Sequence, residues 1–259
     1  AISQNVNAQK NTLYGEGALI NNTSGKNNSA FGFNTLYENT TGFNNTAVGN
    51  SALYSNNSYA NTAVGAAALY VNESGWANTG VGADALYMNS WGNRNVAVGA
   101  AALQLNESGN FNTAVGVSAL HYNIANYNVA VGGEALYRNT TGSGNTANGS
   151  EALLNNTAGY INVASGYQAL KSNTSGAGNV ADGAFVLYKN TTGSGNTAQG
   201  PYALYSNTTG NNNTALGYFA DVASGSINNT TAIGYNAKVT ASNNIVIGNS
   251  TITKIGGFV

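Results

Sequence analysis

Apolar and polar residues follow one short phrase that recurs along almost the whole chain. The phrase reads Asn-Thr-Ala-Val-Gly, two variable residues, Ala-Leu-Tyr-x-Asn, and then a turn rich in Gly, Ser, Thr and Asn. Most of its glycines are 17 residues apart, with two steps of 16 and a last step of 14. They are Gly15, Gly32, Gly49, Gly65, Gly82, Gly99, Gly116, Gly132, Gly149, Gly166, Gly183, Gly200, Gly217, Gly234 and Gly248. Such a regular period predicts a solenoid, in which each repeat forms one coil stacked on the next.

Positions are numbered here from the glycine of each coil, so Val48 stands at −1 and Leu53 at +4. The segment from −4 to 0 predicts a β-strand, because Thr and Val favour a pleated backbone. Alternation places Ala and Gly on one face of this strand and Thr and Val on the other. We expect two short strands per coil and a narrow parallel β-roll. A helix is disfavoured, because each glycine in a helix interior costs ~1 kcal/mol relative to alanine.

Leucine and asparagine form further columns, each with one member per coil. Leucine recurs at +4, which predicts a stacked apolar core. Asparagine recurs at −4 and at +7, where amides of successive coils can hydrogen-bond as a ladder. The following Gly is expected to supply a permissive turn conformation, and this turn loses one residue in the 16-residue steps. Representative members are Leu53, Leu69 and Leu86 at +4, Asn45, Asn61 and Asn78 at −4, and Asn39, Asn56 and Asn72 at +7.

The −1 position gives a second apolar stripe on the opposite face of the strand. If Ala and Leu fill the coil, this stripe needs a partner, and the same stripe on sister chains around a symmetry axis would provide one. The alternative is a monomer in which both faces are internal. The stripe comprises Phe31, Val48, Val64, Val81, Val98, Val115 and Val131, and it becomes apolar again at Leu216, Ile233 and Ile247.

Between these apolar segments the stripe is polar, at Asn148, Ser165, Asp182 and Gln199. Polar residues in a packed axis must be hydrogen-bonded or hydrated. We therefore expect a water-filled polar layer that fixes the register of the copies. In a symmetric assembly, copies of Asp182 would lie close together and favour a structural cation. No other metal site and no cofactor is expected.

Composition excludes several classes of function. Charged residues make up 7% of the 259-residue chain and the net charge is −1, so no basic surface attracts nucleic acid. The sequence has no cysteine and no apolar stretch long enough to insert into a membrane. His121 is the single histidine, which leaves no base for a triad. Glu134 and Glu151 are expected to be solvated surface charges rather than a catalytic pair. The sequence predicts no enzyme.

Aromatic residues in the turns are the best candidates for recognition. Exposed rings can stack on sugars or on neighbouring fibres, and the alternative is that they shield the edge of the roll or pack between chains. Phe43, Tyr59 and Trp76 stand at −6 in three successive coils. The nearby turns contain Trp91, Phe111, Tyr127 and Tyr160.

The chain resembles a known family in two stretches. The segments 231–238 and 245–250, Thr-Ala-Ile-Gly-Tyr-Asn-Ala-Lys and Ile-Val-Ile-Gly-Asn-Ser, look like the head repeats of YadA-like trimeric autotransporter adhesins. The segments 203–210 and 213–218 are similar to stalks of bacterial and phage tail-fibre proteins. Those stalks often precede an intramolecular chaperone of the S74 peptidase type, and the ending 255–259 resembles the segment before it.

This resemblance implies a left-handed β-roll, a parallel homotrimer and display on a cell or virion surface. The expected organisation is an N-terminal extension (1–10), a solenoid of 17-residue repeats (11–217) and YadA-like C-terminal coils with a tail (218–259). The principal functional expectation is an extracellular structural fibre or stalk. Neither end shows an obvious helical or charged cap, so end-to-end polymerisation into filaments is also expected.

Two other functions stay open. The first is an adhesin or receptor-binding fibre that holds surface glycans on its aromatic turns. The second is an ice-binding solenoid, suggested by the row of Thr46, Thr62 and Thr79, although valines interrupt that row at Val96, Val129, Val163 and Val180.

Overall fold

The computed structural model describes residues 9–253, and every regular element in that range is a β-strand. The chain divides into two compact units, Ala1–Gly144 and Asn145–Val259. The N-terminal unit contains β1 (Thr12–Tyr14), β2 (Ser29–Phe31), β3 (Thr46–Val48), β4 (Ser55–Asn56), β5 (Thr62–Val64), β6 (Val71–Asn72), β7 (Thr79–Val81), β8 (Val96–Val98), β9 (Thr113–Val115) and β10 (Val129–Val131). The C-terminal unit contains β11 (Thr146–Asn148), β12 (Val163–Ser165), β13 (Val180–Asp182), β14 (Thr197–Gln199), β15 (Thr214–Leu216), β16 (Asp221–Val222), β17 (Thr231–Ile233), β18 (Lys238–Val239) and β19 (Ile245–Ile247).

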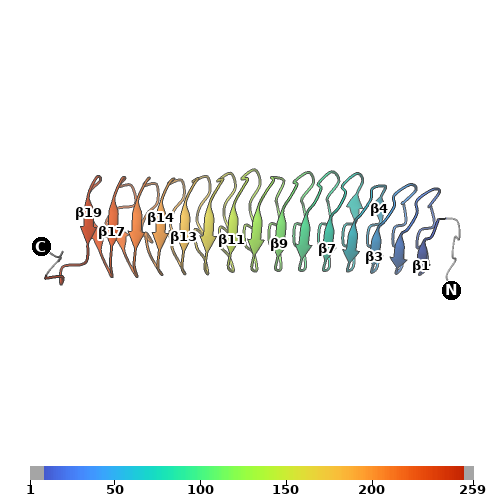
Figure 1. Cartoon of the computed structure of the whole chain (residues 1–259), viewed down its shortest axis with the longest axis horizontal. Helices are drawn as coiled ribbons and strands as arrows, with labels where there is room; N and C mark the ends of the chain where they lie inside the picture. The colour runs from blue at the N-terminus through green and yellow to red at the C-terminus, as the bar shows by residue number, and fades with distance from the viewer. Residues whose placement is uncertain (1–8, 254–259) are drawn as a thin grey trace, which may run out of the picture. The chain divides into compact units, whose positions relative to one another are not determined.

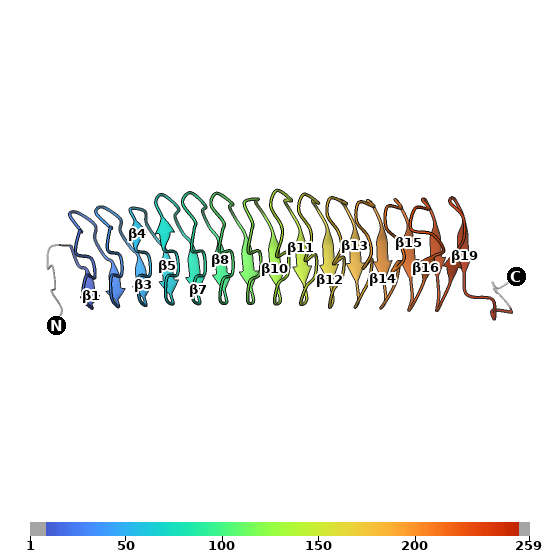
Figure 2. The same ribbon diagram turned by 180° about the vertical axis from the view of Figure 1, so that it is seen from behind.

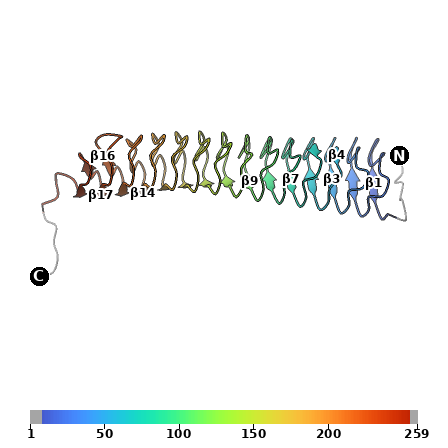
Figure 3. The same ribbon diagram turned by 90° about the horizontal axis from the view of Figure 1, so that it is seen from above.

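Each unit is a parallel β-solenoid with coils of about 17 residues (Figure 1), as the sequence predicts. The −3 to −1 segment of each coil pairs in parallel with the same segment of the next coil. In the N-terminal unit Ala47 is opposite Ala63, and in the C-terminal unit Ala164 is opposite Ala181. The view from behind shows the same succession of coils within each unit (Figure 2). The paired strands form one side of the coils, and the turns form the other (Figure 3).

The two faces of the strand differ as alternation predicts. Ala47 and its equivalents point into the coil and are fully buried, whereas Val48 on the other face is 38% exposed. The same in-and-out pattern holds in strands of both units. The alternative of a monomer with both faces internal is therefore wrong for the described residues, because the −1 side chains lie outside the coil.

The expectation of a second strand in every coil is also wrong. Paired two-residue strands occur only between β4 and β6 and between β16 and β18 within residues 9–253. Elsewhere, the segment after the glycine is a series of turns, in which the residues at +2 and +4 have left-handed backbone angles, such as φ 55° at Ala101 and φ 50° at Leu103. Coil-to-coil hydrogen bonding nevertheless continues there, since the Leu103 amide donates to the Ala119 carbonyl at 2.9 Å.

The leucine column forms the core despite this unusual backbone. Leu53, Leu69 and Leu86 are completely buried, each with φ between 50° and 53°. A left-handed conformation costs a non-glycine residue about 1–3 kcal/mol. Burying a leucine side chain returns about 1.5–3 kcal/mol. Burial therefore offsets the backbone strain, and the leucine is retained where glycine would be the usual choice.

The two asparagine columns are buried and bridge successive coils, as predicted. At −4, the Asn78 Oδ1 atom accepts the backbone N–H of Asn95 at 3.0 Å. At +7, the Asn89 Nδ2 group donates to the Asn72 Oδ1 atom at 2.9 Å. Both columns converge on the turn, where the Gly92 carbonyl accepts one bond from Asn78 and one from Asn89, each at 2.8 Å. The ladders thus satisfy buried turn carbonyls that no strand partner reaches.

The turn glycine is required for close approach and not, as the sequence suggested, for a permissive backbone angle. Gly42 has no positive φ. A Cβ atom on it would lie 2.2 Å from the Asn39 Oδ1 atom and 2.6 Å from the Ser58 carbonyl oxygen. The predicted deletion site is confirmed. In a 17-residue step Asn28 Nδ2 donates to the Gly42 carbonyl, 14 residues further on, whereas in the 16-residue step Asn45 Nδ2 donates to the Ser58 carbonyl, 13 residues further on, at 2.8 Å. The missing residue therefore lies in this turn.

The described start of the N-terminal unit carries a cap that the sequence did not reveal. The Gln9 Oε1 atom accepts a bond from Asn22 Nδ2 at 2.8 Å, in the place that a preceding asparagine would fill. The Gln9 Nε2 group donates to the Thr23 carbonyl at 2.7 Å. The side chain of Gln9 therefore completes the +7 ladder of the first coil.

The last coils of the C-terminal unit have a different interior. Thr230 replaces asparagine at −4, and its hydroxyl donates to Asn213 Oδ1 at 2.7 Å. Asp221 replaces leucine at +4 and is buried. Burial raises the pKa of the Asp221 carboxyl, while bonds from Ser206 and the charge of Lys238 oppose that shift. The buried leucine and asparagine columns thus stop before residues 231–238 begin.

Candidate functional site

In the N-terminal unit, strands β1, β2, β3, β5, β7, β8, β9 and β10 belong to one parallel sheet, called the large sheet here. Its outer face carries an exposed column of apolar side chains. The −1 side chains remain 38–40% exposed at Phe31, Val48, Val64, Val98, Val115 and Val131. Tyr14 at the start of the column is 62% exposed. Parallel pairing aligns these side chains in register, as with Val48 opposite Val64. An unbroken apolar column of this kind is typical of an interaction surface.

The polar layer predicted from the sequence lies on the corresponding face of the C-terminal unit. Asn148, Asp182 and Gln199 are exposed, and Ser165 is half-buried. Gln199 Nε2 donates to Asp182 Oδ2 at 3.4 Å, so the Asp182 carboxylate has a partner within its own unit. Residues 9–253 contain no cluster of three or more metal-ligating side chains. The cation at Asp182 depends on symmetry-related copies and stays a prediction.

Most of the aromatic residues selected from the sequence form one continuous column in the N-terminal unit. Phe43 stacks on Tyr59 with ring centroids 5.0 Å apart, and Tyr59 stacks on Trp76 at 5.8 Å. Phe111 stacks on Tyr127 at 5.3 Å. The sequence analysis did not identify Arg94, which joins the two parts. Its guanidinium lies 4.5 Å from the Trp76 ring centre and 5.2 Å from that of Phe111.

This geometry limits what the column can bind. The rings inside the column use both faces on their neighbours, so this part of the column presents mainly ring edges to solvent. A sugar needs an open ring face for stacking, and the interior of the column does not supply one. Trp91 and Tyr160 are 53% and 54% exposed and take part in no stacked pair of this column. The column is therefore better suited to stabilising the turns than to holding a glycan.

Tyrosines at +5 form a second stacked column. Tyr37, Tyr54, Tyr70 and Tyr87 follow one another with centroids 4.9–5.1 Å apart. His121 occupies the same position and stacks on Tyr137 at 5.0 Å. Burial lowers the pKa of His121, although a hydrogen bond with the backbone of Ala101 partly opposes this. Its Nδ1 atom is buried without a hydrogen-bond partner among the described residues.

The C-terminal unit contains an aromatic face that the sequence analysis did not identify. Phe185, Tyr202 and Phe219 at +2 stack with centroids 5.0 and 4.6 Å apart. Beside them at +1 lie Tyr167, Tyr218 and Tyr235, which are 47%, 46% and 65% exposed. Aromatic residues recurring at +1 and +2 were the signal for this face in the sequence. The candidate rings were instead chosen from the turn before the glycine.

The Glu151 side chain is paired with groups of the next coil. Glu151 forms an ion pair with Lys171 and accepts a bond from Gln168 Nε2 at 2.9 Å. The Lys171 interaction lowers the pKa of the Glu151 carboxyl and raises that of the Lys171 amine. Within the described range, no helix has the length and apolarity needed to cross a bilayer.

Comparisons with protein-family models, with curated proteins and with solved structures found no match to this chain.

Proposed function

We propose that this chain is a subunit of an extracellular structural fibre or stalk, and that copies associate through the outer face of the large sheet. The exposed apolar column at −1 in the N-terminal unit carries this proposal. Side chains such as Val64 and Val98 are aligned in register and remain 38% and 39% exposed. A second copy of the same face matches them in chemistry and spacing, because both columns repeat once per coil.

The low charge of the chain supports self-association over other partners. With a net charge of −1, two copies repel each other little. A homotrimer around a shared axis would bury the apolar −1 column. It would also enclose water at the polar layer formed by Asn148, Ser165, Asp182 and Gln199. The resemblance to YadA-like heads and tail-fibre stalks supports this stoichiometry, a left-handed coil and placement on a cell or virion surface. The chaperone-like ending at 255–259 lies outside the described residues.

End-to-end polymerisation has less support than lateral association. Gln9 already accepts the Asn22 side-chain bond that an incoming coil would otherwise satisfy at that end. Axial addition would have to displace this cap. Ice binding gains no support either, because the −3 row alternates between threonine and valine without a repeated pattern.

Cysteine cross-linking tests the proposed face directly, since the natural chain contains no cysteine. Val98→Cys places a single thiol in the apolar column. Glu73→Cys is the matched control, because Glu73 is exposed in a turn. Under mild oxidation at low concentration, Val98→Cys is expected to form a disulfide-linked dimer and Glu73→Cys is not. Equal cross-linking of both variants, or of neither, contradicts association through this face.

A further inference from the structure

Tyr218 in the C-terminal unit is oriented differently from the rings in the stacked columns. Phe219 lies parallel to Tyr202 within 7°, and the two rings stack from one coil to the next. Their ring planes are therefore roughly perpendicular to the direction in which the coils stack. Tyr218 is turned by 86° from Phe219, with centroids 4.8 Å apart. The edge of Phe219 therefore covers at most one face of Tyr218. The other face is open to solvent, in agreement with an exposure of 46%.

Tyr235 continues this orientation in the next coil. Its ring is parallel to Tyr218 within 10°, and the centroids are 6.0 Å apart. Because the plane of the Tyr218 ring runs along the direction in which the coils stack, the two rings lie edge to edge. Together they form one continuous surface and do not cover each other's faces. Tyr235 is 65% exposed. In the coil before Tyr218, the same +1 position holds Pro201, which is exposed.

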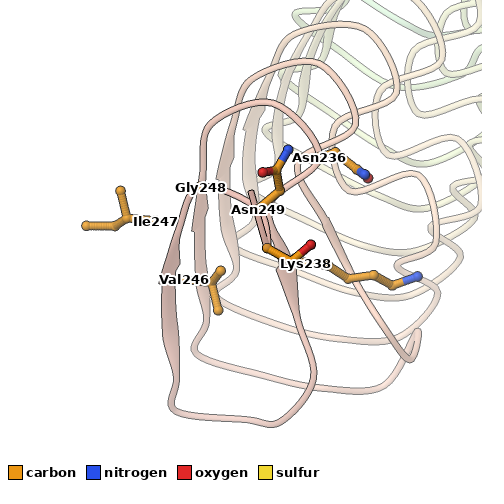
Figure 4. Close-up of a pocket in the computed structure, with 7 residues that line it drawn as sticks. Asn236, Lys238, Val246, Ile247, Gly248 and Asn249 are labelled. Carbon is orange, nitrogen blue, oxygen red and sulfur yellow. The ribbon is translucent and has the colours of Figure 1, made fainter. Parts of the chain in front are cut away.

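A pocket with polar and apolar lining lies beyond Tyr235. It has a volume of about 500 Å³ and is lined by Asn236, Lys238, Val246, Ile247, Gly248, Asn249 and Ser250 (Figure 4). Val246 points to the inner side of β19 and Ile247 to the outer side. Asn249 is anchored beside Tyr235, since its Nδ2 group donates to the Tyr235 carbonyl at 3.3 Å. The pocket thus offers amide, hydroxyl and ammonium groups next to an open aromatic ring.

We propose that Tyr218 and Tyr235 bind consecutive sugar rings of a linear β-linked glycan, and that the pocket beyond Tyr235 binds the next sugar. Open aromatic faces pack on the C–H face of a pyranose, and amides hydrogen-bond its hydroxyls. Neighbouring coils of a parallel sheet are ~4.8 Å apart. An extended β-linked chain advances by a similar distance per sugar, so one ring per coil matches one sugar per coil.

This site does not depend on the proposed self-association, because its rings lie in the turn after the glycine and not on the strand face. It also differs from the sites expected from the sequence. Phe43 and Tyr59 use their faces on each other, whereas Tyr218 and Tyr235 keep one side open.

Affinity electrophoresis of the full chain, in native gels containing hydroxyethylcellulose or alginate, tests the proposal. The natural chain is expected to be retarded in at least one gel. Removing one stacking ring by Tyr235→Ala or Tyr218→Ala is expected to weaken binding ~5-fold, whereas Tyr235→Phe retains it. Retardation by alginate alone would assign the main polar contact to Lys238, and Lys238→Ala would then abolish it.

Tyr127→Ala is the matched control, because Tyr127 is 62% exposed but stacks on Phe111. It is expected to bind like the natural chain. The proposal is overturned if neither polysaccharide retards the natural chain, or if Tyr127→Ala weakens binding as much as Tyr235→Ala. A change in the native mass of folded Tyr235→Ala would also overturn it, because the ring would then belong to an interface between copies.

Discussion

In the N-terminal unit the −1 position is apolar from Phe31 to Val131, whereas in the C-terminal unit it begins with Asn148 and includes Asp182 and Gln199. The interior does not follow this change. Ala97 in one unit and Ala181 in the other are both fully buried, as are Leu103 and Leu187. Closing the coil therefore dictates which residues stand inside it. The outer positions are free of that demand, so their composition can differ between the two units.

The largest effect on stability is expected from removing one buried asparagine in each unit. This pair of variants tests whether the asparagine ladders stabilise both units equally. Asn78→Ala removes the buried acceptor of the Asn95 amide, and Asn179→Ala does the same to the Asn196 amide. An unsatisfied buried amide and the lost side-chain bonds are expected to lower the free energy of unfolding by ~3 kcal/mol in each variant. Chemical denaturation followed by circular dichroism measures the change.

The control for this pair is Asn50→Ala. Asn50 is exposed and accepts a bond from the hydroxyl of neighbouring Ser51, so the expected change is below ~0.5 kcal/mol. If Asn78→Ala and Asn179→Ala differ by more than ~1 kcal/mol, the asparagine ladders do not stabilise the two units equally.

A smaller effect on stability is expected from the outer side chains, which differ between the two units. Arg94→Ala interrupts the aromatic column of the N-terminal unit by removing the cation between Trp76 and Phe111. At an exposed site such contacts are worth ~0.5–1 kcal/mol. Arg138→Ala, at another exposed arginine of the same unit, is expected to change stability less. Thermal unfolding of both variants makes the comparison, and equal losses would show that Arg94 does not connect the column.

The smallest effect concerns His121. Because burial lowers its pKa in the folded protein, the unfolded chain takes up the proton more readily as the pH falls below about 6.5. The stability of the natural chain should therefore decrease on acidification. His121→Tyr, which restores the tyrosine of the +5 column, removes this dependence. Between about pH 7.5 and about pH 5.5 the melting temperature of the natural chain is expected to fall ~1–2 °C further than that of the variant.

A contrary result for His121 would be an identical pH dependence in both proteins. Differences between the two chains isolate this residue, because the carboxylates that also titrate on acidification are common to both.

The sequence allowed the period, the in-and-out alternation and the buried leucine and asparagine columns to be predicted, because each depends on residue type at a fixed spacing. The turns after the glycine were not predictable in the same way. Leucine has no preference for left-handed angles, so only the closed coil explains the φ of 50° at Leu53. The cap by Gln9 was missed because its contacts are with Asn22 and Thr23, in a coil that follows it.

The candidate sites were less predictable than the core. Residue type suggested that Phe43, Tyr59 and Trp76 are exposed, which holds for Phe43 and Tyr59 while Trp76 is half-buried, and it did not predict the direction of their ring faces. That direction depends on neighbours in adjacent coils, and it distinguishes the stacked column from the open rings of Tyr218 and Tyr235. Arg94 belongs to the column through its position between Trp76 and Phe111, which residue type alone does not reveal.

The native mass in solution tests the central claim, that the outer face of the N-terminal unit binds copies of the same chain. Sedimentation equilibrium of the natural chain is expected to give three times the chain mass. Val81→Lys combined with Val98→Lys places charges in the apolar column and is expected to give the mass of one folded chain. Glu73→Lys combined with Glu107→Lys, at exposed turn positions, should leave the assembly intact. A single-chain mass for the natural protein at every concentration would contradict the account.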